Sequence, residues 1–345
     1  YSVKCNEEMQ QKYTEKVCAE IQKWSKNLKR RVSTVYFGGG TPSLIGAEKI
    51  IKILDAVNKN FEISNPEITL EVNPADYSSV DFEKLAFSGI NRVSVGAQAL
   101  EDKSLKILGR RHSVNDIIKT YESIKLAKID NISFDMIIGF PGQSLDDIKT
   151  FLNFYKENRL SHLSAYLLKV EPGTPYFESD FEFISDDMCS DFYIFISNEM
   201  KKMGYEHYEI SNFARSGFES KHNLNCWEQK EYIGLGAAAH SYLNNKRYSN
   251  LENLEEYIID FNKKQIQETQ DIEAKKKEYM LLGLRKIQGV SIQKFKEKFI
   301  QNPLYIYRNE LEKLASQKLI VVDGNYIKLT NKGLDFANLV WEEFV

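Results

Sequence analysis

Three consecutive glycines, Gly38, Gly39 and Gly40, end an apolar and aromatic run at residues 32–37 and are followed by Thr41. The run is rich in β-branched and aromatic residues, which predicts a buried strand. Glycine has no Cβ and tolerates positive φ, so its backbone can approach a ligand closely. An amphipathic pattern predicts a helix soon afterwards, and no Lys-Ser or Lys-Thr pair follows as in a phosphate-binding P-loop. The glycines therefore occupy a strand-to-helix loop, where α/β proteins bind ligands; the alternative is a plain tight turn.

The same alternation of strand and helix continues to residue 170. Further strands are predicted at 66–74, 91–96, 132–139 and 163–170, and helices at 6–27, 46–59, 79–87, 101–108, 113–128 and 145–155. Repeated β-then-α units with apolar strands predict a parallel sheet covered by helices. The fold class is therefore α/β, and the number of units favours an incomplete barrel.

Composition narrows the class of protein. The chain has 345 residues, of which 42% are hydrophobic, so it can bury a large core. A net charge of -3 argues against general nucleic-acid binding. The sequence holds no long apolar run, so we expect no transmembrane segment. Its four scattered cysteines form no disulfide framework, so we expect a reducing, cytoplasmic location.

Polar residues lie at the carboxyl ends of the predicted strands, where parallel barrels keep their chemistry. Glu71, Gln98 and Asp135 end three of the strands, and Arg110 lies in a nearby loop. Asp135 stands within an apolar strand, so its charge requires a partner. A structural ion pair with an arginine would satisfy it, but the joint pattern favours a polar ligand site.

Five motifs, in this order and spacing, resemble the radical S-adenosylmethionine (SAM) family, and more closely its anaerobic coproporphyrinogen III oxidase-like branch. They are Tyr36-Phe37-Gly38-Gly39-Gly40-Thr41-Pro42, Glu71-Val72-Asn73-Pro74, Ser94-Val95-Gly96-Ala97-Gln98, Leu108-Gly109-Arg110-Arg111-His112 and Asp135-Met136-Ile137-Ile138-Gly139-Phe140-Pro141-Gly142. The resemblance covers essentially the whole chain. It implies a partial (β/α)6 barrel that binds SAM.

The resemblance also implies roles for single residues. The Gly38 to Thr41 loop would hold the methionine end of SAM, with the backbone of Gly39 and Gly40 against its amino group. Glu71, Gln98, Arg110 and Asp135 would line the rest of the site. Asp135 would accept hydrogen bonds from the ribose hydroxyls, which suits a carboxylate.

One departure from the family concerns its [4Fe-4S] cluster. The family binds the cluster through three cysteines spaced CxxxCxxC, and this spacing does not occur in the sequence. Tyr1-Ser2 resembles the stretch that follows the third cysteine, so we expect the cluster loop and a first strand to precede Tyr1. A true loss of the cluster is the alternative. In either case this chain by itself is not expected to cleave SAM.

A second motif follows a predicted strand at 205–214. In a polar loop, His222 and Trp227 stand five residues apart. On the residues alone, a turn-capping histidine and a core tryptophan are favoured. Haem-chaperone members of the branch, however, carry His-Asn-x-x-Tyr-Trp, which His222, Asn223 and Trp227 match and in which Cys226 replaces the tyrosine. The resemblance thus implies haem binding, and a haem-accepting apoprotein of respiratory or membrane-associated type as partner.

The C-terminal residues 272–345 look like a small α+β, winged-helix-like module. Helices are predicted at 273–287, 291–299, 305–317 and 331–343, with a hairpin at 319–329. Thirteen Lys and Arg against nine Asp and Glu give only weak support for DNA binding. We predict three domains, which are a barrel at 1–180, an extension with the haem motif at 181–271, and this module.

Three functions are consistent with the sequence. The leading one is a SAM-binding haem chaperone that transfers haem to an acceptor, indicated by the His222 motif. The second is an oxygen-independent coproporphyrinogen III oxidase, which would require the missing cluster. The third is a non-enzymatic winged-helix regulator, which a salt-dependent DNA shift would reveal.

Overall fold

The computed structural model describes residues 6–28, 30–170, 172–173, 176 and 180–345. Tyr1-Ser2 and the loop expected before them lie outside these residues. The chain forms two compact units. Unit 1 comprises Tyr1–Glu206 and Ser211–Glu219, and unit 2 comprises His207–Ile210 and Ser220–Val345. No helix within the described residues has the length and apolar character needed to span a membrane.

Besides the 3-10 turn η1 (Pro42–Ile45), fifteen regular elements make up the chain to residue 227, and one or two helices follow each of the first five strands. They are α1 (Glu7–Asn27), β1 (Arg31–Phe37), α2 (Ala47–Asn60), β2 (Glu62–Val72), α3 (Ser79–Ser88), β3 (Arg92–Gln98), α4 (Asp102–Ile107), α5 (Val114–Leu126), β4 (Asn131–Ile138), α6 (Leu145–Asn158), β5 (His162–Leu167), α7 (Asp186–Lys202), β6 (Glu206–Glu209), β7 (Asn212–Ala214) and α8 (Lys221–Trp227). Capping boxes begin α3, α5 and α6, so short polar signals set where these helices start.

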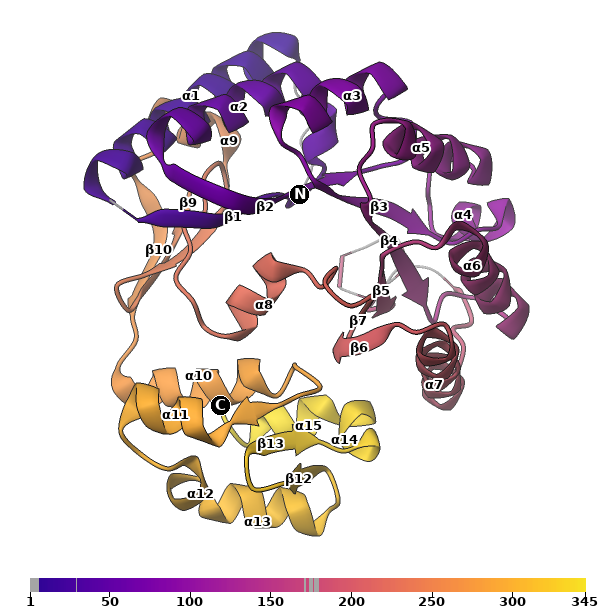
Figure 1. Cartoon of the computed structure of the whole chain (residues 1–345), viewed down its shortest axis with the longest axis vertical. Helices are drawn as coiled ribbons and strands as arrows, with labels where there is room; N and C mark the ends of the chain where they lie inside the picture. The colour runs from indigo at the N-terminus through magenta and orange to yellow at the C-terminus, as the bar shows by residue number, and fades with distance from the viewer. Residues whose placement is uncertain (1–5, 29, 171, 174–175, 177–179) are drawn as a thin grey trace. The chain divides into compact units, whose positions relative to one another are not determined.

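The strands form one curved sheet in the order β1-β2-β3-β4-β5-β7-β6. Strands β1 to β5 are parallel, as predicted, and β7 runs antiparallel to β5. Helices α2, α3, α5 and α6 lie along the outer side of the curve (Figure 1). The single strand predicted at 205–214 is wrong, because the chain turns at residues 210–211 and divides the alternating pattern into β6 and β7.

The two faces of this sheet differ in polarity because side chains alternate along each strand. On the outer face, Leu70, Val93, Phe134 and Leu163 are fully buried and belong to one core with the helices. The opposite face, here called the inner face, is polar. It comprises Thr69, Glu71, Arg92, Ser94, Asn131, Ser133, Asp135, His162 and Ser164, which neighbour one another in the strand register.

Strand β1 departs from the prediction of a buried strand. None of its seven residues is fully buried. It is the end strand of the described sheet and pairs only with β2 there, which leaves its other edge without a neighbouring strand. Strand β2 also begins at Glu62, earlier than predicted, because it pairs with β1 from its first residue.

Unit 2 continues from α8 with two small sheets and its own core. Its further elements are β8 (His240–Leu243), β9 (Lys246–Asn250), α9 (Leu254–Ile259), β10 (Lys264–Thr269), α10 (Ile272–Gly283), β11 (Val290–Ser291), α11 (Ile292–Phe299), α12 (Pro303–Ile306), α13 (Arg308–Ser316), β12 (Ile320–Val322), β13 (Tyr326–Leu329), α14 (Asn331–Asp335) and α15 (Ala337–Glu342). The sheets have the orders β10-β9-β8 and β11-β13-β12. The antiparallel pair of β12 and β13 confirms the hairpin predicted at 319–329.

Two predicted helices of unit 2 are interrupted. The helix expected at 305–317 is divided at Tyr307 into α12 and α13, and the last helix is divided at Phe336 into α14 and α15. Tyr307 is buried and belongs to the core with Leu311 and Phe344. Core packing at Tyr307 therefore prevails over the helical pattern of the sequence, whereas Phe336 is exposed.

Candidate functional site

The glycine loop begins where β1 ends, and each of its first two glycines serves a different purpose. A Cβ on Gly38 would lie 2.4 Å from Cε1 of Tyr36 and 2.8 Å from Oε1 of Glu71, so only glycine fits there without movement. Gly39 and Gly40 have φ of 80° and 79°, in the left-handed region. A Cβ on Gly39 would meet nothing within 4 Å. The loop thus packs closely on one side and leaves open space beside its backbone.

Glu71 ties this loop to the inner face of the sheet. The Tyr36 hydroxyl donates a hydrogen bond of 2.6 Å to Oε1 of Glu71, and the Gly39 N–H donates one of 3.3 Å to Oε2. Burial, with the charge of Glu71 next in size, raises the pKa of Tyr36 far above its usual range, so the phenol stays a donor. Tyr36 is a residue of the first motif for which the sequence alone predicts no role. Its aromatic ring beside the glycines was the available signal.

The pKa of the Asp135 carboxyl group is strongly perturbed. Ser94 Oγ donates to Oδ1 of Asp135 at 3.3 Å, and Ser164 is its register neighbour on β5. Burial raises the pKa of Asp135 to about 6, and the nearby charge of Glu71 adds to this. Hydrogen bonds from Ser164 and Ser94 and the charge of Arg92 act in the opposite direction. The Asp135 carboxyl group therefore titrates at about pH 6 while it accepts hydrogen bonds from two serines.

Gln98 and Arg110 complete the set predicted around this site. Gln98 ends β3 with a φ of 61°, is 6% exposed, and its buried Oε1 has no hydrogen-bond partner among the described residues. Partial burial lowers the pKa of Arg110, while the charges of Tyr176 and Asp135 act to raise it. The structure thus links Gly39 with Glu71 by a hydrogen bond, and Asp135 with Glu71 and Arg110 electrostatically.

Thr41 contributes no side-chain contact to this group. It precedes η1 as its N-cap residue without a side-chain capping bond, and its carbonyl accepts from the N–H of Leu44. Its hydroxyl is therefore not committed to capping the turn. The fit for a ligand rests on the open backbone at Gly39 and the orphaned amide oxygen of Gln98.

The second motif lies in unit 2, on a helix and not in the polar loop that was predicted. Helix α8 forms because the Ser220 side chain accepts a hydrogen bond of 3.3 Å from the Asn223 N–H and caps it. The Sγ of Cys226 lies 4.0 Å from Nε2 of His222. Burial raises the pKa of the Cys226 thiol, partly offset by the charge of Arg247. Every residue of α8 except Lys221 is half-buried, so His222 and Cys226 are accessible together.

Trp227 ends α8 and packs on an arginine. The Arg285 guanidinium carbon lies 4.3 Å from the centre of the Trp227 ring and 5.0 Å from that of Trp341. The buried Nε1 of Trp227 has no hydrogen-bond partner among the described residues. This tryptophan therefore anchors α8 within unit 2, whatever else its ring contacts.

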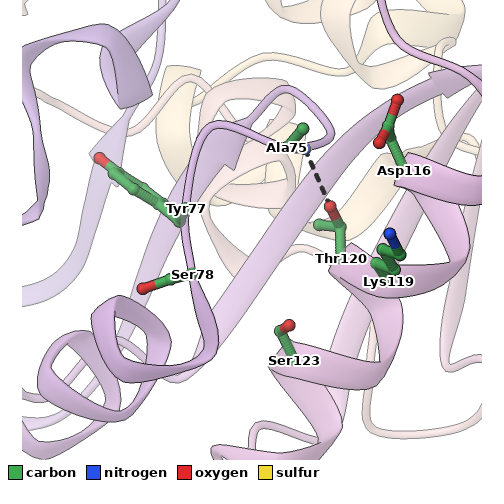
Figure 2. Close-up of a pocket in the computed structure, with 7 residues that line it drawn as sticks. All are labelled: Ala75, Tyr77, Ser78, Asp116, Lys119, Thr120 and Ser123. Carbon is green, nitrogen blue, oxygen red and sulfur yellow. Dashed lines mark hydrogen bonds between the residues drawn. The ribbon is translucent and has the colours of Figure 1, made fainter.

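A surface pocket of about 220 Å³ lies elsewhere in unit 1. It is lined by the loop at residues 75–78 and by four side chains of α5 (Figure 2). The Ala75 N–H donates to Thr120 Oγ1 at 3.1 Å across it. The pocket includes none of the predicted site residues, so it belongs to neither motif.

No group of three or more His, Cys, Asp or Glu side chains suited to a metal ion occurs in the described part of the chain. Cys18, Cys189 and Cys226 are free thiols there. The described residues therefore fit SAM, through the glycine loop and the inner face, but do not fit an iron-sulfur cluster.

Known proteins resemble the chain over nearly its whole length. Residues 4–155 match the model of the radical SAM superfamily, and residues 273–336 match that of the HemN C-terminal domain. Heme chaperone HemW of Lactococcus lactis subsp. lactis is 34% identical over 96% of this chain and 89% of its own length. Heme chaperone HemW of Bacillus subtilis is 33% identical over 91% and 86%.

Two further likenesses extend the comparison. Radical S-adenosyl methionine domain-containing protein 1, mitochondrial, of Dictyostelium discoideum is 33% identical over 88% of this chain and 78% of its own length. The solved structure of coproporphyrinogen III oxidase (HemN) from Escherichia coli matches with a TM-score of 0.85 at 18% identity, over 99% of this chain and 85% of that chain. At that identity the structural likeness shows a shared fold.

Proposed function

We propose that this chain, which belongs to the radical SAM superfamily and within it to the family of heme chaperone HemW, binds haem and passes it to an acceptor protein. The observation that carries the proposal is the 34% identity to a heme chaperone over 96% of the chain. The likeness to coproporphyrinogen III oxidase is one of fold, so it does not favour that reaction. A cytoplasmic location is part of the proposal, and the free thiols Cys18, Cys189 and Cys226 agree with it.

Haem is the cargo in this proposal, and His222 on α8 is its proposed iron ligand. A neutral imidazole is a common axial ligand of haem iron. Asn223 and Cys226 would flank the ligand on the same short helix, and Trp227 would hold that helix in place through Arg285. The accessible His222 and Cys226 support this assignment, since an iron ligand must be reachable by the porphyrin.

SAM is the proposed ligand of the inner face. The backbone of Gly39 and Gly40, with Gly38 and Thr41 on either side, would take its amino acid end. The orphaned Oε1 of Gln98 supports a polar ligand there, because a buried amide oxygen without a partner is costly.

The remaining polar side chains would surround the rest of SAM. Glu71 and Arg110 would bear its charges, and Asp135 would accept from the ribose hydroxyls. A carboxylate that loses a proton near pH 6 is an acceptor at neutral pH. The family's [4Fe-4S] cluster would enable cleavage of SAM, but the described residues offer it no ligand set.

A haem titration followed by Soret absorbance tests the cargo and its ligand. Saturable binding is expected, and His222→Ala should weaken it at least tenfold, about 1.4 kcal/mol or more. Alanine favours helix, so this change should leave α8 folded. The matched control is His240→Ala, since His240 is an exposed histidine of the same unit. No saturable binding by the folded wild-type chain would contradict the proposal, and equal weakening in both variants would contradict the role of His222.

A further inference from the structure

Arg92 is a buried cation without a direct partner. It begins β3 on the inner face and is 2% exposed. Its buried Nε has no hydrogen-bond partner, and the guanidinium forms no ion pair within the described part of the chain. A buried charge is costly unless nearby opposite charge compensates it. Something on the inner face must therefore compensate Arg92 through space.

The row of residues around Arg92 is polar but equally unpartnered. Thr69 on β2 and Asn131 on β4 are its register neighbours. The buried Oγ1 of Thr69 and Oδ1 of Asn131 also have no hydrogen-bond partner among the described residues. Because all three strands alternate in step, these side chains share the inner face. The row offers Arg92 dipoles but no counter-charge.

Two carboxylates lie further along the same face, toward the carboxyl ends of the strands, and a third, that of the buried Glu67, lies two residues before Thr69 on β2. Glu71 lies two residues beyond Thr69 on β2. Ser94, two residues beyond Arg92, donates to Asp135. Arg92 acts electrostatically on Asp135 and on Tyr36, the hydrogen-bond partner of Glu71. The cation therefore stands beneath both carboxylates of the site.

Other titratable groups also face Asp135 and must be considered. They are Tyr36 on β1, Glu71 on β2, Arg110 after α4 and Tyr155 on α6. On β5, Ser164 is the register neighbour of Asp135, and His162 is the next residue along the inner face. Burial keeps the pKa of His162 well below its usual range, so this imidazole is neutral and brings no competing positive charge. Arg110 is only partly buried and is more exposed to solvent than Arg92, so solvent screens its charge more strongly. Arg92 is thus the buried cation of the group.

We propose that Arg92 is a positioning residue of the SAM site, the buried cation that keeps the Asp135 carboxylate charged and able to accept hydrogen bonds from SAM. This inference rests on the proposed role of Asp135 in binding SAM. It goes beyond the residues that would touch SAM, because Arg92 acts from the row beneath them. Removing its charge should move the titration of Asp135 toward higher pH.

The experiment uses two neutral variants, one conservative variant and a control. Arg92→Met removes the charge, and Arg92→Gln removes it while keeping hydrogen-bonding capacity toward Thr69 and Asn131. Arg92→Lys retains the charge. Arg215→Met is the control, because Arg215 is an exposed arginine of the same unit. Circular dichroism would establish that each variant is folded.

Two readouts separate this inference from the proposed site. The first is the titration midpoint of Asp135 in the ligand-free chain, followed by carboxyl carbon NMR and assigned with Asp135→Asn. The midpoint should lie near 6 in the wild type and rise by about one pH unit in the neutral variants. The second is SAM affinity by calorimetry, which should fall about fivefold at pH 6 and little at pH 8.5.

The outcomes are distinct. Arg92→Lys and Arg215→Met should keep the wild-type midpoint and affinity. An unchanged midpoint in folded Arg92→Gln or Arg92→Met would overturn the inference while leaving the proposed site intact. Failure of the wild-type chain to bind SAM at any pH would overturn the proposed site, and with it the part of Arg92 in binding.

Discussion

Cys226 Sγ lies 4.0 Å from Nε2 of His222, across one turn of α8. Residues four apart share one face of a helix, so both side chains would approach a haem iron from the same side. An iron has one axial position on that side. The two side chains are therefore alternatives, and the one in the better protonation state should ligate.

We expect His222 to be that ligand at neutral pH. Burial raises the pKa of Cys226, so its thiol stays protonated, whereas the thiolate is the form that ligates metal. Cys226→Ser should therefore change haem affinity at pH 7 by less than about threefold, against the tenfold or greater loss in His222→Ala. Haem titrations of both variants at pH 7 and pH 9 provide the measurement. A larger loss in Cys226→Ser than in His222→Ala would identify the sulfur as the ligand.

Asp135→Asn should stabilise the fold while weakening SAM binding. The pKa of Asp135 is raised in the folded chain from 3.8 to about 6, so the folded state binds more protons than the unfolded state between these values. Wild-type stability therefore falls as pH rises through that window. The asparagine variant lacks this loss and should be more stable by about 1 kcal/mol above pH 6, with no advantage near pH 4. Urea unfolding at pH 4, 6 and 8 would show it, and a variant less stable at pH 8 would contradict it.

The parallel strands and their helices could be predicted because their signals are local. The helix predicted at 113–128 begins with the capping box of Ser113 and Asp116, and the apolar run around Phe134 forms a buried strand. Helix α8 was missed because a seven-residue helix shows little periodicity. Its cap, Ser220, was a signal that the polar surroundings of His222 obscured.

The contacts of the candidate site depend on strand register, which sequence periodicity does not give. The residue that Tyr36 bonds, Glu71, is 35 positions away, and their pairing follows from the parallel alignment of β1 and β2. Nothing local in the sequence shows that the side chain of Arg92, within the strand predicted at 91–96, lies beneath Asp135. The positions of single polar residues were therefore predictable, and their partners were not.

Gly38→Ala and Gly39→Ala should separate packing from ligand access. The new Cβ at position 38 would collide with Tyr36 and Glu71 and should cost about 1–3 kcal/mol of stability. The Cβ at position 39 meets open space, so the cost there is the left-handed φ, about 1 kcal/mol. The methyl group that Gly39→Ala introduces would enter the space proposed for SAM. Thermal unfolding should thus show the larger loss for Gly38→Ala, and calorimetry at a temperature where both are folded should show weakened SAM binding by Gly39→Ala. Wild-type SAM affinity in Gly39→Ala would count against the glycine loop as the SAM site.

His162 should make the fold sensitive to acid. Burial, followed by the charge of Arg92, holds its pKa well below the usual 6.5, so the unfolded chain binds a proton that the folded chain excludes. Stability from this group is complete above pH 6.5 and is lost as pH falls below it, by at most about 1.4 kcal/mol per pH unit. His207, whose pKa burial lowers to about 4, contributes in the same direction.

Comparing wild type with His162→Gln isolates His162, because the variant retains His207. The variant lacks the hydrogen bond between Ser133 and the imidazole, so it should be less stable than the wild type at pH 7.5. This difference in stability should narrow between pH 6.5 and 5. His240→Gln, at an exposed histidine, should leave the wild-type pH dependence unchanged. Parallel unfolding curves for wild type and His162→Gln across this range would show that His162 does not titrate on unfolding as described.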